Sequence, residues 1–315
     1  MTYKICYCTD ENYAPYAAVS INSALQNKNP DTDYEFIIAS QYLSKDSKNR
    51  FWKLCNPTFV QINREDFQNF RCGINYISEA AAYRLIIPNS LNGKLLYVDC
   101  DTLIQEDLSE LFEIDLQDNC IGAVLDCNYK TGRKRTGTIN YFNSGVILFD
   151  CDKWQEGNYF ERVRNELNNP VNTLPDQDAL NRVLAGHVLY LPLKYNAMRF
   201  QTPRKFDYIH DTLKEYNLAL KNPAIKHYIS KHKPWQITYD EKEREIYLEY
   251  TSGSFFDEIY FYIKAVENIN QVQLGITGYN QVQSNINQIS EQVKNIYIDE
   301  NGNLFNHDNM ERLKV

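Results

Sequence analysis

Two aspartates at the end of an apolar run are the residues best suited to chemistry. Asp99 and Asp101 follow residues 95–98 (LLYV) and are separated only by Cys100. In extended chain, side chains two residues apart point to the same side, so the two carboxylates would lie together. Two like charges placed together need a positive group between them, and a hard divalent cation meets that need. The segment therefore predicts a metal site, although a capping aspartate in a solvated turn fits the same letters.

A histidine far along the chain is the candidate third ligand. His227 lies in the segment 226–235 (KHYISKHKPW). Imidazole is a common metal ligand and suits Mn²⁺. Lys233, six residues further on, could pair with a phosphate as a point charge. A single histidine is more often structural, and His232 is a nearby alternative, so this assignment depends on the rest of the site.

Two enzyme classes use a strand followed by Asp-x-Asp. Metal-dependent glycosyltransferases hold a cation against the diphosphate of a sugar nucleotide in this way. Haloacid-dehalogenase-like phosphatases use the first aspartate of Asp-x-Asp-x-Thr-Leu as a nucleophile, and residues 99–103 (DCDTL) fit that pattern too. The phosphatase motif belongs on a first core strand, with an Asp-Asp or Gly-Asp-x-x-x-Asp segment later. Nearly 100 residues precede the motif and neither segment follows it, so the sequence favours the transferase.

The elements that must position these residues alternate between strand and helix. The apolar strand-like runs are 3–8, 34–39, 58–62 and 94–98, and the helical patterns cover 12–25, 43–54 and 78–87. This alternation predicts an α/β fold with a mostly parallel sheet. Such sheets bind ligands beyond the carboxyl ends of their strands, where Asp10, Asp99 and Asp126 stand.

The composition indicates an ordinary globular protein. The chain has 315 residues, 43% of them hydrophobic and 23% charged, with a net charge of −8. Since coating a nucleic acid needs a basic face, we expect no nucleic-acid partner. Eight cysteines without a Cys-x-x-Cys pair favour buried thiols in a reducing compartment. No stretch resembles a signal peptide or a membrane span, so we expect a cytoplasmic protein, with peripheral attachment at the inner membrane face left open.

The last 50 residues differ from the rest. We expect a catalytic domain over residues 1–265 and an appendage over 266–315. An apolar stripe at spacing 4, 3, 4, 3 predicts an amphipathic helix from Val282 to Ile296, and Asn301-Gly302 predicts a hairpin over 296–305. The stripe could be a packed helix, a homo-oligomer seam or a partner site.

Five segments in one order make the chain resemble glycosyltransferase family 8, which includes glycogenin and bacterial lipopolysaccharide α-galactosyltransferases. The segments are CTDENYAPYAAVSINSAL (8–25), AAYRLIIP (81–88), YFNSGVILFD (141–150), PDQDALN (175–181) and KHYISKHKPW (226–235). The resemblance covers about residues 3–240. It implies a single Rossmann-like, GT-A-type nucleotide-sugar-binding domain with a helical and hairpin appendage at its C-terminus.

The resemblance implies a role for each matching residue. The metal ligands for Mn²⁺ or Mg²⁺ would be Asp99, Asp101 and His227. The donor-binding residues would be Cys8, Asp10, Asn12, Tyr13, Arg84, Cys100, Asn143, Ser144 and Lys233. Of these, Tyr13 would lie against uracil, Asp10 would accept from its N3–H, and Lys233 would neutralise the leaving phosphate. Asp176 and Gln177 would flank the anomeric carbon, and Asp126 would face the donor or the acceptor.

The activity so implied is retaining transfer of glucose or galactose from a UDP-sugar to a glycan or lipid-linked glycan hydroxyl. Because an amide is a poor nucleophile, Gln177 favours same-face attack, in which the leaving phosphate accepts the acceptor's proton, over a double displacement. A phosphatase and a non-catalytic nucleotide-sugar-binding protein are the alternatives. Two departures stand out: Ser230 occupies a place where the family often has glycine, and the tail has few basic residues before 312, so docking on anionic lipid is doubtful.

Overall fold

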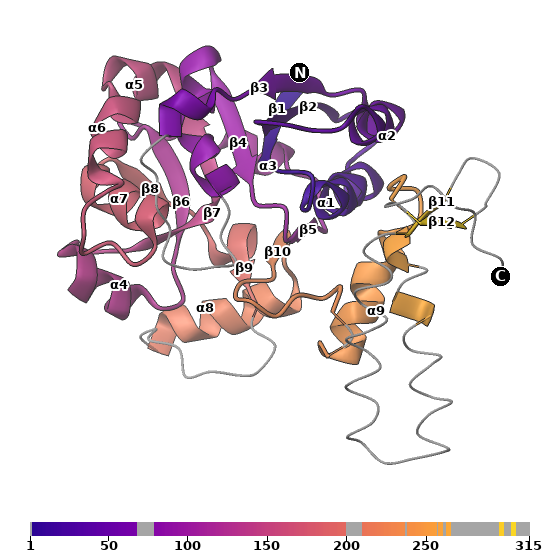
Figure 1. The fold of residues 1–315 in the computed structure, drawn as a ribbon. Helices are drawn as coiled ribbons and strands as arrows, with labels where there is room; N and C mark the ends of the chain where they lie inside the picture. The colour runs from indigo at the N-terminus through magenta and orange to yellow at the C-terminus, as the bar shows by residue number, and fades with distance from the viewer. Residues whose placement is uncertain are drawn as a thin grey trace. The chain divides into compact units, whose positions relative to one another are not determined.

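The computed structural model describes residues 2–67, 79–199, 210–236, 238–256, 258–260, 263–265, 296–298 and 304–306 (Figure 1). The chain divides into two compact units, Met1–Lys233 and Pro234–Val315. The predicted catalytic domain runs on to residue 265, and that limit stays a prediction. Residues 282–295 of the predicted amphipathic stripe lie outside the described residues.

A seven-stranded sheet forms the centre of the first unit in the described residues. Its strands are β1 (Thr2–Cys8), β2 (Asp33–Ser40), β3 (Thr58–Gln61), β4 (Lys94–Val98), β6 (Ile121–Leu125), β7 (Phe142–Asp150) and β8 (Val188–Tyr190). Their order is β3-β2-β1-β4-β7-β6-β8. The pairs from β3 to β4 and the β6–β8 pair are parallel, whereas β7 is antiparallel to both of its neighbours. The predicted α/β fold with a mostly parallel sheet is confirmed.

The first-unit helices lie around the strands of this unit (Figure 1). They are α1 (Ala14–Asn27), α2 (Lys45–Cys55), α3 (Ser109–Glu113), α4 (Tyr129–Thr136), α5 (Cys151–Glu156), α6 (Tyr159–Glu166), α7 (Pro175–Val183) and α8 (His210–Lys221). Local chemistry sets their ends: Ser44 and Asp150 accept backbone N–H groups at the starts of α2 and α5, and Asn56 ends α2 in the left-handed conformation.

One predicted helix is wound differently. Residues 78–87 were expected to be α-helical, but they form two 3₁₀ segments, η2 (Glu79–Leu85) and η3 (Ile87–Ser90). Apolar spacing does not distinguish the two helix types over so short a stretch. The tighter winding buries Arg84, which has 4% of its surface exposed, beside the sheet.

A small second sheet brings the far end of the chain back to the Asp99 region. It has the order β5-β10-β9, formed by β5 (Thr102–Ile104), β10 (Ile225–His227) and β9 (Ala197–Met198). The antiparallel β5–β10 pair sets His227 opposite Thr102. Tyr228 N–H donates to the Asp101 carbonyl at 2.9 Å. This pairing places an imidazole beside a residue more than 120 positions earlier in the chain.

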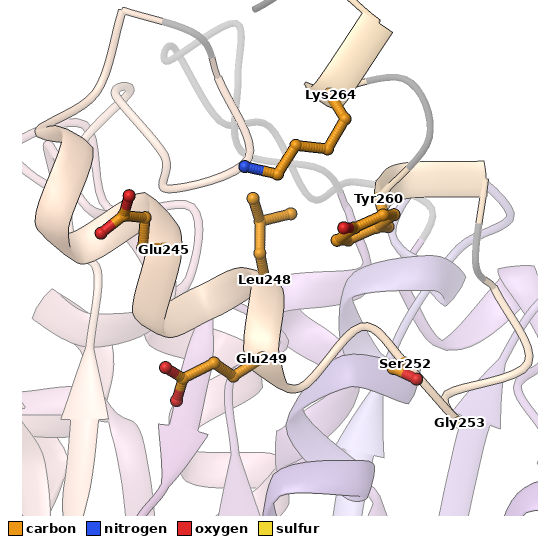
Figure 2. A pocket seen from close by; sticks show the side chains of 7 residues that line it. All are labelled: Glu245, Leu248, Glu249, Ser252, Gly253, Tyr260 and Lys264. Atoms are coloured by element: carbon orange, nitrogen blue, oxygen red, sulfur yellow. The ribbon is translucent and has the colours of Figure 1, made fainter.

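The second unit contains α9 (Glu241–Glu249) and a hairpin of β11 (Ile296–Ile298) and β12 (Leu304–Asn306). The two strands pair antiparallel, as the predicted hairpin requires, and the predicted turn at Asn301-Gly302 falls outside the described residues. A cleft of about 700 Å³ in this unit is lined by Glu245, Leu248, Glu249, Ser252, Gly253, Tyr260 and Lys264 (Figure 2). None of the predicted site residues lines it. In the part of the chain that the structure describes, we find no helix with the length and apolarity to span a membrane.

Candidate active site

Most of the predicted site residues line one cleft in the first unit, with a volume of about 640 Å³. The predicted residues on its wall are Cys8, Tyr13, Arg84, Asp99, Cys100, Asp101, Asn143, Ser144, Asp176, Gln177, His227 and Lys233. Asp126 lines it as well. Asp10 and Asn12 are not on the wall: the Asp10 carboxylate accepts from Tyr13 N–H at 3.0 Å at the start of α1, and Asn12 is exposed.

Asp99, Asp101 and His227 converge, as the sequence predicted. One ligand atom from each lies within 4.8 Å of the others. His227 Nε2 is 3.2 Å from an Asp101 oxygen and 3.7 Å from an Asp99 oxygen. Asp99 N–H donates to the Gly145 carbonyl at 2.7 Å, which holds the end of β4 against β7. Two carboxylates and an imidazole are a donor set that Mn²⁺ and Mg²⁺ accept, so these residues fit a divalent cation.

The two aspartates are neutralised by different cations. Lys233 Nζ contacts Asp101 and donates to the Tyr228 carbonyl at 2.8 Å. Burial opposes ionisation of Asp101, yet Lys233 and His227 hold its pKa well below the usual range. Asp99 instead accepts from the Tyr97 hydroxyl at 2.5 Å and pairs with Arg84 at 3.1 Å.

Arg84 joins the metal-ligand end of the cleft to α7. Its guanidinium is 3.1 Å from Asp99, 3.6 Å from Asp176, and lies over the Tyr97 ring at 4.4 Å. It also donates to the Ser144 carbonyl. Burial works against its charge, but Asp99, Tyr97 and Asp176 raise the pKa of Arg84 further, so it stays a cation. Burial raises the pKa of Asp176 despite this neighbour.

Gln177 is held rigidly by its neighbours. Its Oε1 accepts from Ser144 N–H at 3.0 Å and from Asn143 Nδ2 at 3.2 Å. Its Nε2 donates to Asp126 at 3.1 Å, an oxygen that also receives Asn143 Nδ2 at 3.1 Å. All four side chains are less than 9% exposed. The carboxamide is therefore fixed in one orientation at the cleft wall.

An ion pair that the sequence did not reveal anchors α7. Arg135 on α4 donates to both oxygens of the fully buried Asp178 at 2.7 Å, and Tyr141 donates to the same carboxylate at 2.5 Å. Burial disfavours the charge on Asp178, but Arg135 and Tyr141 lower its pKa. Asp178 also accepts from two backbone N–H groups before α7. The pair fixes the helix that carries Asp176 and Gln177.

Tyr13 and two thiols also line the cleft. The half-buried Tyr13 ring lies at the start of α1, edge-on to Tyr16 with 5.5 Å between centroids. Cys100 Sγ contacts the Cys8 carbonyl at 3.3 Å. Burial raises the pKa of both Cys8 and Cys100, so these thiols are neutral. No disulfide joins the cysteines of the described residues, as expected.

Ser230, which also lines the cleft, has φ of 84°, in the left-handed region that favours glycine. The backbone therefore has the form that a glycine would adopt, while the residue carries a Cβ. The departure noted in the sequence is a site of local backbone strain.

Sequence comparison identifies the chain. Residues 4–238 match the model of glycosyl transferase family 8. The chain belongs to this family. Family membership favours the transferase over the phosphatase interpretation of residues 99–103, and it confirms the predicted resemblance.

Several relatives of known sequence are similar over most of the chain. General stress protein A of Bacillus subtilis is 29% identical, over 81% of this chain and 95% of that protein. A putative glycosyltransferase of Haemophilus influenzae is 33% identical, over 74% of this chain and 73% of the relative. Lipopolysaccharide 1,2-glucosyltransferase of Escherichia coli strain K12 is 29% identical, over 74% of this chain and 72% of that protein.

Solved structures show the same fold. An active-site variant of LgtC, with glutamate in place of a glutamine, superimposes with a TM-score of 0.71 at 26% identity, over 79% of this chain and 95% of LgtC. The galactosyltransferase LgtC in complex with donor and acceptor sugar analogues superimposes with a TM-score of 0.68 at 28% identity, again over 79% of this chain and 95% of LgtC. The family 8 chain thus has the mixed α/β fold, with a mostly parallel sheet, of GT-A glycosyltransferases such as LgtC.

Proposed function

We propose that this family 8 chain transfers glucose or galactose, with retention, from a UDP-sugar to a hydroxyl of a glycan or lipid-linked glycan, and that it requires Mn²⁺ or Mg²⁺. The observation that carries the metal requirement is the convergence of Asp99, Asp101 and His227 within 4.8 Å. The relatives support either hexose, because one is a glucosyltransferase and another a galactosyltransferase.

The chain's own cations would receive the leaving diphosphate. Asp99, Asp101 and His227 would hold the divalent cation, which when bound supplies positive charge to the diphosphate oxygens. Lys233 and Arg84 are buried cations that line the cleft. Both are pre-positioned by protein partners, so little reorganisation is needed as negative charge develops on the leaving group.

Gln177 would stabilise and position the reacting sugar. Its carbonyl oxygen is already an acceptor for Ser144 N–H and Asn143 Nδ2, so its lone pairs are engaged. A carboxamide is a weak nucleophile, and these hydrogen bonds weaken it further. This supports same-face departure and attack, in which the leaving phosphate takes the acceptor's proton. That the LgtC active site includes a glutamine is consistent with such a role.

The nucleoside would bind near the ends of β1 and β4. Tyr13, Cys8 and Cys100 line that part of the wall, and the Tyr13 ring offers a flat face for a base. Asp10 accepts a hydrogen bond from Tyr13 N–H, and it would accept from uracil through its remaining lone pairs. Asn143, Ser144 and Asp176 would contact the donor sugar, and Asp126 would face the donor or the acceptor.

A panel of UDP-sugars, assayed for UDP release with Mn²⁺ and with a chelator, tests the proposal. We expect release from UDP-glucose or UDP-galactose that the chelator abolishes. Asp99→Ala should abolish turnover, and Gln177→Ala should lower kcat by about 10²-fold. The control variant Asp46→Ala, at an aspartate 71% exposed on α2, should release UDP at the rate of the parent protein.

Two outcomes would contradict parts of this proposal. Donor binding without UDP release from any sugar would identify a non-catalytic binding protein. A completely inactive Gln177→Ala variant with intact donor binding would support an obligatory covalent step at that residue.

A further inference from the structure

A chain of buried carboxamides connects His227 to Asp126. His227 Nδ1 lies 2.9 Å from Asn196 Oδ1, and Asn196 Nδ2 lies 2.9 Å from Asn143 Oδ1. Asn143 Nδ2 in turn reaches Asp126 and Gln177. Asn196 ends the 3₁₀ turn η4 (Leu193–Asn196), is 1% exposed and does not line the cleft.

Two groups of fixed polarity that contact Asn143 determine the direction of the hydrogen bonds in this series of carboxamides. The Asp126 carboxylate only accepts, so Asn143 must present its NH₂ group to it. Gly145 N–H only donates, and at 3.0 Å it requires the Asn143 carbonyl oxygen. That oxygen then faces Asn196, which must supply its own NH₂ group.

The tautomer of His227 follows from the same reasoning. With the Asn196 NH₂ group committed to Asn143, only its carbonyl oxygen faces the imidazole. His227 must therefore donate from Nδ1, which leaves Nε2 as the ring nitrogen that can bind a cation. Nε2 is the nitrogen that lies 3.2 Å from Asp101 and 3.7 Å from Asp99.

We propose that Asn196 is a positioning residue that accepts from His227 Nδ1–H and so directs Nε2 at Asp99 and Asp101, and that it links this end of the site to Gln177. Partners that orient a ligating histidine raise its basicity and fix its ring. The inference rests on the proposed metal site, but not on the sugar that is transferred. Asn196 touches neither the cleft nor its contents, so it acts through His227 and Asn143.

Two substitutions at Asn196 separate its two hydrogen bonds. Asn196→Leu removes both, and it leaves His227 Nδ1 and the Asn143 oxygen without partners. Asn196→Asp keeps an acceptor for His227 but places a second acceptor against the Asn143 oxygen. Asn27→Leu is a control away from the site, since Asn27 donates to two backbone carbonyls between α1 and β5.

The first measurement is the histidine tautomer, read from ¹⁵N shifts of ¹⁵N-histidine-labelled protein saturated with Mg²⁺, so that Nε2 faces a cation as well as the two carboxylates. The chain has five histidines, and the signal of His227 is assigned as the one lost in His227→Gln. We expect the Nδ1–H form in the parent protein, in Asn196→Asp and in Asn27→Leu. Asn196→Leu should lose this preference.

The second measurement is Mn²⁺ affinity by titration calorimetry, without any sugar nucleotide. Asn196→Leu should bind Mn²⁺ about 10- to 100-fold more weakly, whereas Asn196→Asp and Asn27→Leu should stay within about threefold of the parent. In the UDP-release assay, Asn196→Asp should nevertheless lose kcat, because the orientation of Asn143 beside Gln177 is disturbed.

A His227 Nδ1 that carries no proton in the Mg²⁺-saturated parent protein, or parent-like Mn²⁺ affinity in Asn196→Leu, would overturn the inference. So would an Asn196→Asp variant that weakens Mn²⁺ binding as much as Asn196→Leu does. If the tautomer and Mn²⁺ affinity respond as expected but no sugar is transferred, the positioning role holds and the proposed transferase function fails.

Discussion

Gly145 provides the most direct test of the proposed metal site. A Cβ added at this position would lie 2.3 Å from His227 Cε1 and 2.6 Å from the Asp99 Oδ2 atom. The backbone there is not in the left-handed region, so alanine brings no conformational strain of its own. The strand cannot shift to make room, because Gly145 N–H donates to Asn143 and its carbonyl accepts from Asp99 N–H.

The size of the effect follows from these distances. Ordinary van der Waals contact begins at 3.4 Å, so the His227 ring must retreat by about 1 Å. Metal–ligand distances tolerate deviations of only about 0.2 Å. Losing a partner behind one ligand already weakens metal binding by about 10- to 100-fold. Displacing two ligands in Gly145→Ala should therefore weaken Mn²⁺ binding by at least about 100-fold, while overpacking costs about 1–3 kcal/mol of folding free energy.

Titration calorimetry with Mn²⁺, together with urea unfolding, separates these two effects. Gly186→Ala is the matched control: Gly186 has φ of +85° and nothing within 4 Å of an added Cβ. It should lose roughly 1–2 kcal/mol through backbone strain but keep its Mn²⁺ affinity. If a folded Gly145→Ala protein binds Mn²⁺ like the parent, Asp99 and His227 do not share a cation and the reasoning is refuted.

Two further predictions concern stability. Ser230→Gly should raise the free energy of unfolding by about 0.5 kcal/mol, measured in urea, because it relieves left-handed strain but loosens the unfolded chain; a loss of stability would show that the serine hydroxyl is needed there. The Asp107 carboxylate accepts from the backbone N–H groups of Asn29 and Ser109. Its slight burial alone would raise its pKa, but the hydrogen bonds from Ser109 and Asn29 lower the pKa to about 2. A lowered pKa gives stability that is present above the unfolded value of about 3.9 and is lost as pH falls toward 2. The stability gap between parent and Asp107→Asn should therefore be constant above pH 5 and shrink below pH 4; a gap that ignores pH would contradict it.

The first four strands of the fold could be predicted because each one is a short apolar run in the sequence. The four apolar runs in the first 100 residues became β1 to β4 within one or two residues of their expected ends. The reversal of β7 could not be predicted. Its run, VILF at 146–149, has the buried pattern of a central strand in either direction, and only the pairing with β4 and β6 reveals it.

The residues of the site were predictable to the extent that they belong to recognisable segments. Asp99, Asp101 and His227 stand at strand ends with distinctive spacing, and the structure brings them together. Asn196 and Arg135 gave no signal. Each is a single polar residue in an ordinary turn or helix, and its importance depends on a partner more than 30 positions away. Buried polar networks depend on direction and distance, which the order of residues along the chain does not contain.

Lys233 shows why a motif and a structure can describe the same residue differently. The sequence assigned it to a phosphate, whereas here it contacts Asp101. The two descriptions agree once the charges are considered together, because Asp101 and Asp99 each have a protein cation, Lys233 and Arg84 respectively. Under the proposed function, those same carboxylates would turn to a divalent cation, and the two side-chain cations would then be available to a diphosphate. The ion pairs within the cleft therefore hold the cations at the positions where the proposed ligand needs them, and they keep both half-buried carboxylates compensated in its absence.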